Sequence, residues 1–251
     1  NGAGKSTLIK LLAGVYQPDQ GEIHWQGQPV TIPNPVAAIS MGIATMYQEL
    51  DVVDGLSIAE NIFLANPPSR FGIIDRSEVH RRSKELLGMV GLEEAPDTLI
   101  TNIGIGKQQL VEIAKALSKK VRLLILDEPT ASLNEHDSQA LLDLLVEFRA
   151  QGIASILISH KLNEISRVAD QITVLRDGRT VGTLDTHKEP VEEERIIRMM
   201  VDRDLDHRYP QHTPKIGETV FTVEDWSVYH PIHTDRQVIR NVNFHVKRGE
   251  I

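Results

Sequence analysis

The sequence contains no cysteine and no hydrophobic run long enough to cross a membrane, and its acidic residues outnumber its basic ones. The lack of cysteine excludes disulfides, thiolate zinc sites and cysteine nucleophiles, and it fits a reducing compartment. Because a membrane span needs roughly 18 apolar residues, any membrane role must come through a partner. A net charge of −8 argues against sequence-independent nucleic-acid binding, although it allows a local basic patch. We therefore expect a cytoplasmic protein without a nucleic-acid partner.

The sequence does contain enough apolar material for a sizeable core. It has 251 residues, of which 41% are hydrophobic and 25% are charged, so there is room for one large domain and part of another. Aliphatic and β-branched segments alternate with helical patterns, which predicts an α/β fold. The expected strands are residues 42–46, 121–126, 153–159 and 171–175.

Two apolar stripes repeat at helical spacing. One comprises Leu141, Leu144, Leu145 and Phe148, and the other comprises Leu110, Ile113, Ala114 and Leu117. We interpret both stripes as helix faces packed on the sheet and not as ligand sites. For the first helix, Asn134 is the expected N-cap and Gly152 the residue just beyond the C-terminus.

The pattern changes over residues 49–118, which predict a helical subdomain with helices at 57–65 and 75–90 and no strand between them. A strand pair is expected around Ile172 and Val181. Proline and glycine then mark a linker at 211–217, and the strands expected at 220–223 and 238–246 begin a new unit. We thus expect a first domain at 1–210 and the start of a second at 218–251.

The first seven residues form a glycine-rich stretch that leads into a helical pattern: Asn1, Gly2, Ala3, Gly4, Lys5, Ser6 and Thr7. Such a loop lets backbone N–H groups approach the phosphates of a nucleotide, while Lys5 reaches the terminal phosphates and Ser6 ligates Mg²⁺. All seven residues are therefore expected to bind a nucleoside triphosphate. The full motif needs another glycine five positions before Gly4, and no Met begins the chain, so we interpret the sequence as a window cut from a longer protein.

Acidic and polar residues follow three expected strands. Asp127 and Glu128 end one strand, where Asp127 would hold Mg²⁺ and Glu128 would polarise an attacking water, unless the pair only caps the turn before Pro129. His160 follows the next strand at the same sheet edge and can reach a γ-phosphate. Gln48 ends a third strand and could touch Mg²⁺ or the water, or be an ordinary loop residue.

The order of these motifs resembles that of the ATP-binding proteins of ABC transporters. In sequence order they are Walker A at 1–7, the Q-loop residue Gln48, a signature region at 104–109, Walker B with Glu128, a D-loop at 131–134 and the switch residue His160. More narrowly, residues 111–117 and 159–164 resemble the tandem-domain ATPases of bacterial monosaccharide importers. Residues 226–231 are similar to their xylose and multiple-sugar branch.

The resemblance implies that a nucleotide is sandwiched between Walker A of one domain and the signature of the other. Gly104, Gly106, Lys107 and Gln108 would then contact nucleotide bound by the second domain. Gly104 stands where the family has a serine, so one hydroxyl contact to the γ-phosphate is lost, at a cost of about 1.5–3 kcal/mol. Asn134 replaces the usual D-loop aspartate, which affects communication between the sites. We expect two unequal sites.

In the second domain, Tyr229 lies where the family has an adenine-stacking aromatic residue, although it is also an ordinary strand residue.

The resemblance further implies hydrolysis of ATP with Mg²⁺ to drive monosaccharide import at the cytoplasmic face of the membrane. The implied partners are transmembrane permease subunits, an external sugar-binding protein acting through the permease, and a second ABC domain of the same chain. Two alternatives belong to other classes. A GTPase would need an Asn-Lys-x-Asp element and a DNA-repair ATPase a long heptad insertion, and neither is present. The fragment alone could also be an interaction module without turnover.

Overall fold

The computed structural model describes residues 2–47, 50–201, 215–231 and 234–250. By its internal contacts the chain divides into two compact units, residues 1–203 and 204–251. Part of the linker expected at 211–217 lies outside the described residues, so that boundary stays a prediction. Among the described residues, none of the helices has the length and apolar character that a membrane span requires.

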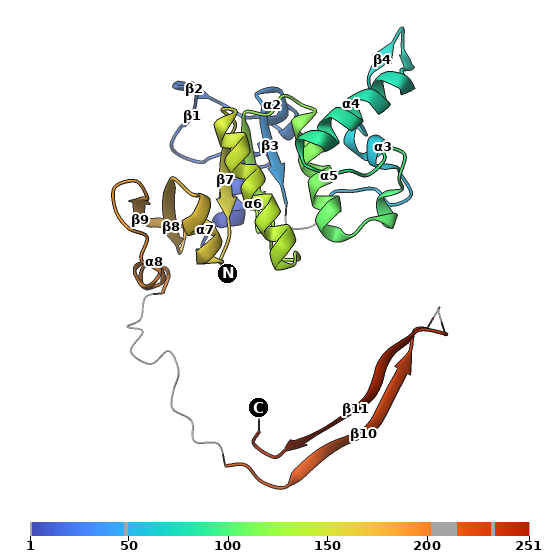
Figure 1. Ribbon diagram of the computed structural model, residues 1–251. Helices are drawn as coiled ribbons and strands as arrows, with labels where there is room; N and C mark the ends of the chain where they lie inside the picture. The colour runs from blue at the N-terminus through green and yellow to red at the C-terminus, as the bar shows by residue number, and fades with distance from the viewer. Residues whose placement is uncertain (1, 48–49, 202–214, 232–233, 251) are drawn as a thin grey trace. The chain divides into compact units, whose positions relative to one another are not determined.

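A parallel three-stranded sheet forms the centre of the first unit (Figure 1). Its strands lie in the order β3 (Ile43–Met46), β6 (Leu123–Asp127) and β7 (Ala154–Ile158). Each begins and ends within two residues of the predicted strand, because runs of aliphatic and β-branched residues favour strands wherever glycine or polar residues bound them. The predicted α/β fold is confirmed.

Helices cover both faces of this sheet. Successive strand residues point to opposite faces, so Leu124 and Leu126 pack with α5 (Ile105–Leu117) and α6 (Glu135–Ala150). On the other face, Ile125 packs with Ile9 of α1 (Lys5–Leu12) and with Ala38 of α2 (Pro35–Ser40).

Both predicted helix stripes lie in the core. Leu141 and Phe148 of α6 are fully buried, and Ile113 and Ala114 of α5 are as well. The Asn134 side chain accepts a hydrogen bond from the backbone N–H of Asp137, as an N-cap does. Gly152, just beyond the helix, has φ 84°. The predicted caps are thus confirmed.

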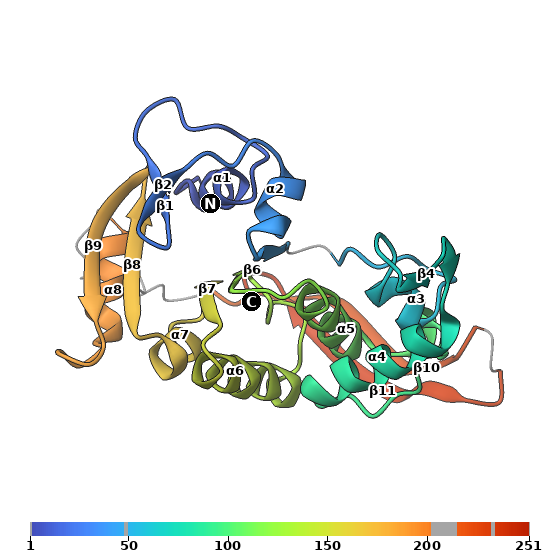
Figure 2. The ribbon, with the colours of Figure 1, turned by 90° about the horizontal axis from the view of Figure 1, so that it is seen from above.

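The helical part of the unit contains α3 (Ile58–Ile62), α4 (Arg76–Met89) and a 3₁₀ turn at Ile100–Asn102, and Figure 2 shows α3 and α4 gathered beside α5. Ser57 and Glu60 cap α3 reciprocally. The helix predicted at 57–65 is shorter than expected. The expectation of no strand between the two helices is wrong, because β4 (Ser69–Arg70) and β5 (Ile73–Ile74) form a small hairpin there.

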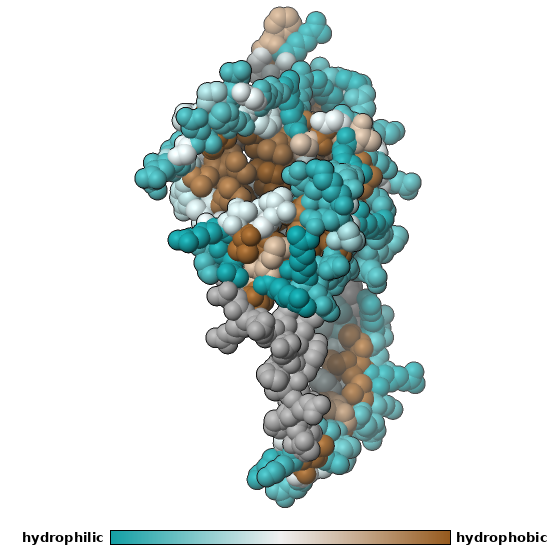
Figure 3. Space-filling model, turned by 90° about the vertical axis from the view of Figure 1, so that its left-hand side faces the viewer, coloured by the Kyte–Doolittle hydropathy of each residue, from teal (hydrophilic) through white to brown (hydrophobic). Residues whose placement is uncertain are grey.

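Two antiparallel hairpins flank the sheet: β1 (Ile23–Trp25) with β2 (Gln28–Val30), and β8 (Gln171–Arg176) with β9 (Arg179–Asp185). The second confirms the strand pair expected around Ile172 and Val181. It packs on α8 (Glu193–Met200) through a separate small core. Figure 3 shows apolar side chains gathered in a hollow on one face of the molecule.

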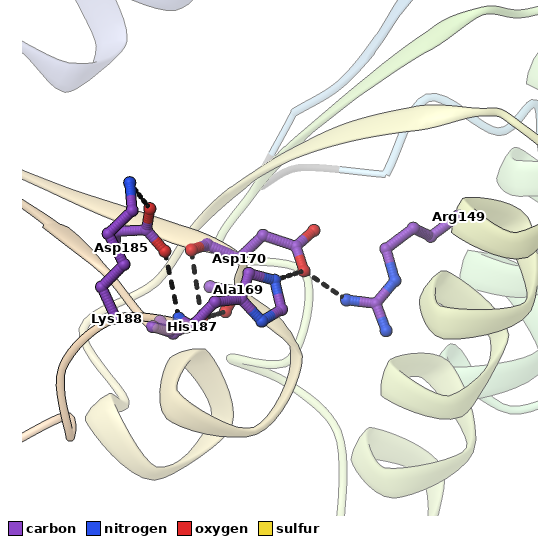
Figure 4. Close-up of polar contacts among 7 residues, drawn as sticks. Arg149, Ala169, Asp170, Asp185, His187 and Lys188 are labelled. Carbon is purple, nitrogen blue, oxygen red and sulfur yellow. Dashed lines mark hydrogen bonds and ion pairs between the residues drawn. The ribbon is translucent and has the colours of Figure 1, made fainter.

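A polar cluster links α6 to the β8–β9 hairpin. The Asp170 carboxylate lies 2.7 Å from Arg149 Nη1 and 3.0 Å from His187 Nε2 (Figure 4). Asp185 accepts from Lys188 and from the His187 N–H, and these bonds lower the pKa of Asp185. The short helix α7 (Leu162–Val168) leads from the sheet to this hairpin.

The second unit is an antiparallel pair, β10 (Thr219–Tyr229) and β11 (Gln237–Lys247). Both strands were predicted, although each is longer than expected. Most of their side chains are exposed, including Phe221 and Phe244, whose ring centroids lie 5.9 Å apart. Tyr229 is the last residue of β10, and its stacking role stays a prediction.

Candidate functional site

The loop before α1 presents a free helix N-terminus. Gly4 is the N-cap with φ 91°, no side chain among the described residues caps the helix, and its first turn carries no acidic residue. The first N–H groups of an α-helix have no partner within the helix, and together with the helix dipole they favour an anion. This end of α1 therefore fits a phosphate group.

The left-handed conformation of Gly4 explains why glycine stands there. A side chain at φ 91° would be strained, and a Cβ would come within 3.3 Å of Gly178 Cα in the β8–β9 turn. The Gly178 N–H also donates to the Ala3 carbonyl over 3.2 Å. The turn at Gly178 thus supports the loop from outside, a contact that the sequence analysis missed.

Asp127, Glu128 and His160 lie together at the carboxyl edge of the sheet. The register pairs Asp127 with Ile158, and the Glu128 N–H donates to the Ile158 carbonyl over 2.8 Å. His160 follows two residues later, and its Nδ1 lies 3.4 Å from Glu128 Oε1. The expected meeting of these residues at one edge is observed.

Lys5 joins the same cluster from α1. Its Nζ lies 4.0 Å from Glu128 Oε1. Two cationic or protonatable side chains therefore approach Glu128 from two different elements. The opening glycine loop and the Asp-Glu pair, 120 residues apart in the sequence, form one site.

The electrostatics of the strand end suit a cation. Burial raises the pKa of Asp127, the neighbouring charge of Glu128 raises it further, and Lys5 partly opposes both. An ionised carboxylate held near another carboxylate is relieved by a bound metal ion. Within the described residues, no group of three or more acidic or histidine side chains could ligate a metal by itself. A metal at Asp127 would therefore need phosphate, hydroxyl and water ligands.

Only some of the remaining predicted nucleotide and metal ligands lie within the described residues. Gly2 lies in the exposed loop, and Ser6 and Thr7 are exposed in the first turn of α1. Asn1 and Gln48 lie outside the described residues, so their predicted roles stay predictions.

The predicted signature residues surround the N-terminus of α5. Gly104 is the N-cap, again without a side-chain cap. Lys107 pairs with Glu94, and Gln108 Nε2 donates to the carbonyls of Ile100 and Ile103, each over 3.1 Å. These two side chains thus bind to their own domain. Their predicted role toward a nucleotide of another domain stays a prediction.

Sequence reasoning also missed a buried polar network behind the site. Thr130 Oγ1 donates to Glu164 Oε2 over 2.6 Å, and Lys161 Nζ donates to the Thr130 carbonyl over 2.9 Å. Thr130 is only 1% exposed and Glu164 only 7%. The sequence gives one indication of this network, which is that two of its residues lie next to predicted site residues. Thr130 follows Glu128 by two residues, and Lys161 directly follows His160.

The fold and the site together define an ATP-binding cassette. The family model for the ABC transporter matches residues 1–131, more than half of the chain, and the chain belongs to this family. Among solved structures, cbiO1 from Clostridium perfringens, part of an ABC transporter complex, aligns with a TM-score of 0.65 at 24% identity over 84% of this chain and 82% of that chain. The fold prediction is confirmed.

Individual relatives are sugar-transport proteins. The L-arabinose transport ATP-binding protein AraG of Geobacillus stearothermophilus is 56% identical over the whole chain. The xylose import ATP-binding protein XylG of Moorella thermoacetica is 46% identical, again over the whole chain. The chain spans about half the length of these curated relatives. The predicted resemblance to tandem-domain sugar importers is confirmed, and the arabinose relative has the higher identity of these two.

Proposed function

We propose that this chain is part of an ATP-hydrolysing subunit that energises import of a monosaccharide by an ABC transporter. The observation that carries the proposal is the convergence of Lys5 and His160 on Glu128, beside the free N-terminus of α1. The names of the relatives support a sugar as cargo, with L-arabinose and xylose as the candidates.

In this proposal each residue has a positional or electrostatic task. Backbone N–H groups at the start of α1 hold phosphate oxygens, and Lys5 neutralises charge on the terminal phosphates. Glu128 orients and deprotonates the attacking water, and His160 donates a hydrogen bond toward the γ-phosphate. The contact between Gly178 and Ala3 supports the loop that presents these groups.

Ser6 and Asp127 would hold Mg²⁺, with Gln48 as the further ligand that the sequence analysis proposed. When bound, Mg²⁺ neutralises charge on the phosphate oxygens. The raised pKa of Asp127 supports this assignment, because burial and a like charge destabilise the carboxylate unless a cation is near.

The proposed partners follow from the same family. Permease subunits would contact the helical part of the first unit, and a second ABC domain would supply the opposite signature. An external sugar-binding protein would act through the permease. We place the protein at the cytoplasmic face of the membrane, as a peripheral subunit.

The test is ATP hydrolysis by the full-length protein and by its Glu128→Gln variant. Loss of the general base should lower the turnover of this site by at least about 100-fold, while ATP affinity stays within about threefold because the glutamine keeps the size of the side chain. Glu147→Gln, on the exposed side of α6, is the matched control and should keep the wild-type rate.

Turnover by Glu128→Gln equal to that of the wild type would remove Glu128 from this role. A full-length protein that binds no ATP would overturn the proposal altogether. A protein that hydrolyses ATP but does not restore sugar uptake in cells lacking their own importer would leave the ATPase and overturn the transport role.

A further inference from the structure

We propose that Thr130, Lys161 and Glu164 form a clamp that sets the separation of Glu128 and His160. We call this set the Thr130 clamp, and its members act as positioning residues and not as catalytic ones. The inference rests on the proposed ATPase function and deepens it, because it names what holds the two catalytic side chains in register.

The clamp closes a ring of three contacts. Thr130 Oγ1 donates to Glu164 Oε2 over 2.6 Å, and Lys161 Nζ donates to the Thr130 carbonyl over 2.9 Å. Lys161 Nζ also lies 3.1 Å from Glu164 Oε1. Both oxygens of the Glu164 carboxylate are thus engaged, one by a hydroxyl and one by an ammonium group.

Each member of the ring is tied to the site by the backbone. Thr130 follows Glu128 by two residues in the turn after β6, and Lys161 directly follows His160 in the loop after β7. Glu164 lies on α7, which begins at Leu162. The ring therefore cross-links the turn that carries Glu128 to the loop that carries His160.

The backbone at Glu128 needs such support. Its φ of 48° lies in the left-handed region, which a residue other than glycine adopts at a cost. The Ala131 N–H donates to the Glu128 carbonyl over 3.1 Å and closes the turn. Directly behind this turn, the buried hydroxyl of Thr130 fixes it to α7.

Two members of the Thr130 clamp, Thr130 and Glu164, are buried, so the removal of one leaves the other without its hydrogen-bond partner. A buried hydrogen bond leaves its partner unsatisfied when one side is removed, and Glu164 is charged and only 7% exposed. Glu128 and His160 are more open to water, with side chains 21% and 59% exposed. The rigid part of the arrangement thus lies behind the site, while the reacting groups face outward.

Four single variants separate positioning from general stability. Thr130→Val keeps the shape of the side chain but removes the hydroxyl, and Thr130→Ser keeps the hydroxyl. Glu164→Gln keeps the size but removes the charge. Arg167→Met is the matched control, because Arg167 lies on the same helix α7 and pairs with Asp143 of α6 over 2.7 Å, away from the clamp.

The first measurement is steady-state hydrolysis by the full-length variants, after subtraction of the rate that remains in Glu128→Gln. Because a small displacement of catalytic groups has a large effect on rate, Thr130→Val and Glu164→Gln should lower kcat by about tenfold, with KM within about twofold. Thr130→Ser should restore kcat to within about twofold, and Arg167→Met should not change it.

The second measurement needs no turnover. Hydrogen–deuterium exchange of residues 127–131 and 158–162 should rise together in Thr130→Val, because the ring couples the two segments, and should stay at the wild-type level in Thr130→Ser and Arg167→Met. This readout also distinguishes the two hypotheses. If the wild type hydrolyses no ATP, the proposed function fails, but coupled exchange still supports the clamp.

The clamp is overturned by either of two results. One is a rise of exchange in Thr130→Val that is confined to residues 127–131, because the two segments would then be independent. The other is an unchanged kcat in Thr130→Val in a protein whose wild type is active. If Glu164→Gln does not fold, the valine and serine variants at Thr130 decide the question alone.

Discussion

Two helices of the first unit, α1 and α5, begin at a glycine N-cap without a side-chain cap, yet their surroundings differ. At α1 the neighbouring ionisable groups, Lys5 and Glu128 among them, converge on the place where a phosphate would bind. At α5 the neighbouring groups bind to each other. Lys107 pairs with Glu94, and the Asp137 carboxylate lies so close to Gly106 that a Cβ there would come within 2.6 Å of Oδ2.

The difference indicates which of the two helix N-termini has the groups for binding a phosphate without another domain. The α1 end combines N–H groups, a lysine and the carboxylates at and just after the end of β6, so we expect it to bind a phosphate and orient a water by itself. The α5 end offers backbone N–H groups and the helix dipole only, and an acidic side chain already lies against its first turn. The predicted role of α5 toward a nucleotide held by another domain, for which we call its N-terminus the lid, stays a prediction.

The largest expected effect tests the self-sufficient end. Lys5→Met removes the cation at the start of α1 while keeping a similar side-chain length. Losing a charge-assisted contact to the terminal phosphates should lower kcat/KM for ATP by about 100-fold, which is about 2.7 kcal/mol. The measurement is steady-state ATP hydrolysis by the full-length protein.

Lys10→Met is the matched control for this prediction. Lys10 lies in the last turn of the same helix, where it faces the ring of Tyr16. Its replacement should change kcat/KM by less than about twofold, because an exposed contact of this kind contributes little. If the two variants behave alike, the comparison between the helix ends loses its basis.

A smaller effect is expected at the lid. Gly104→Ser would restore the hydroxyl that the family places at this N-cap, and a hydrogen bond to a charged group is worth about 1.5–3 kcal/mol. Turnover should be measured in the Glu128→Gln background, where the remaining hydrolysis belongs to the opposite site. We expect it to rise about tenfold.

Gly88→Ser is the control for the serine substitution. It adds the same hydroxyl at an exposed position of α4 where a Cβ meets no other atom within 4 Å. It should leave turnover unchanged. An unchanged rate in Gly104→Ser as well would contradict the proposal that α5 serves the nucleotide of another domain.

The sheet and the edge of the site could be predicted because both depend on local pattern. Parallel strands end at a common edge, so the position of His160 followed from the strand before it and that of Asp127 from β6. The caps of α6 followed from Asn134 and Gly152 for the same reason.

The supporting contacts could not be predicted, because they depend on tertiary packing. The Thr130–Glu164 bond spans 34 residues, and a glutamate in a short helix has no sequence mark of burial. The approach of Gly178 to Gly4 depends on where the β8–β9 hairpin packs. The hairpin of β4 and β5 was not predicted, because strands of two residues are too short to show the alternation of apolar and polar residues that indicates a strand.

The smallest expected effect is on thermal stability, and it concerns the charge of Asp127 beside the N-terminus of α1. Because burial and Glu128 raise the pKa of Asp127 in the folded protein, its ionisation opposes folding. This free-energy penalty on folding is absent at pH values below the pKa of Asp127 in the unfolded state. It is complete at pH values above the raised pKa of Asp127 in the folded state. At pH 7, Asp127→Asn should therefore raise the Tm by about 1–3 °C.

Thermal unfolding of the full-length protein and its Asp127→Asn variant without nucleotide, at a series of pH values, checks this prediction. The gain should shrink as the pH falls through the raised pKa of Asp127 and vanish in acid, where the wild-type carboxyl is also neutral. At the α5 end, Asp137→Asn should not raise the Tm, since Asp137 accepts from Asn134 and lies near Lys107. Equal gains from both substitutions would show that the two ends do not differ in this respect, and would remove the pKa argument for a cation at Asp127.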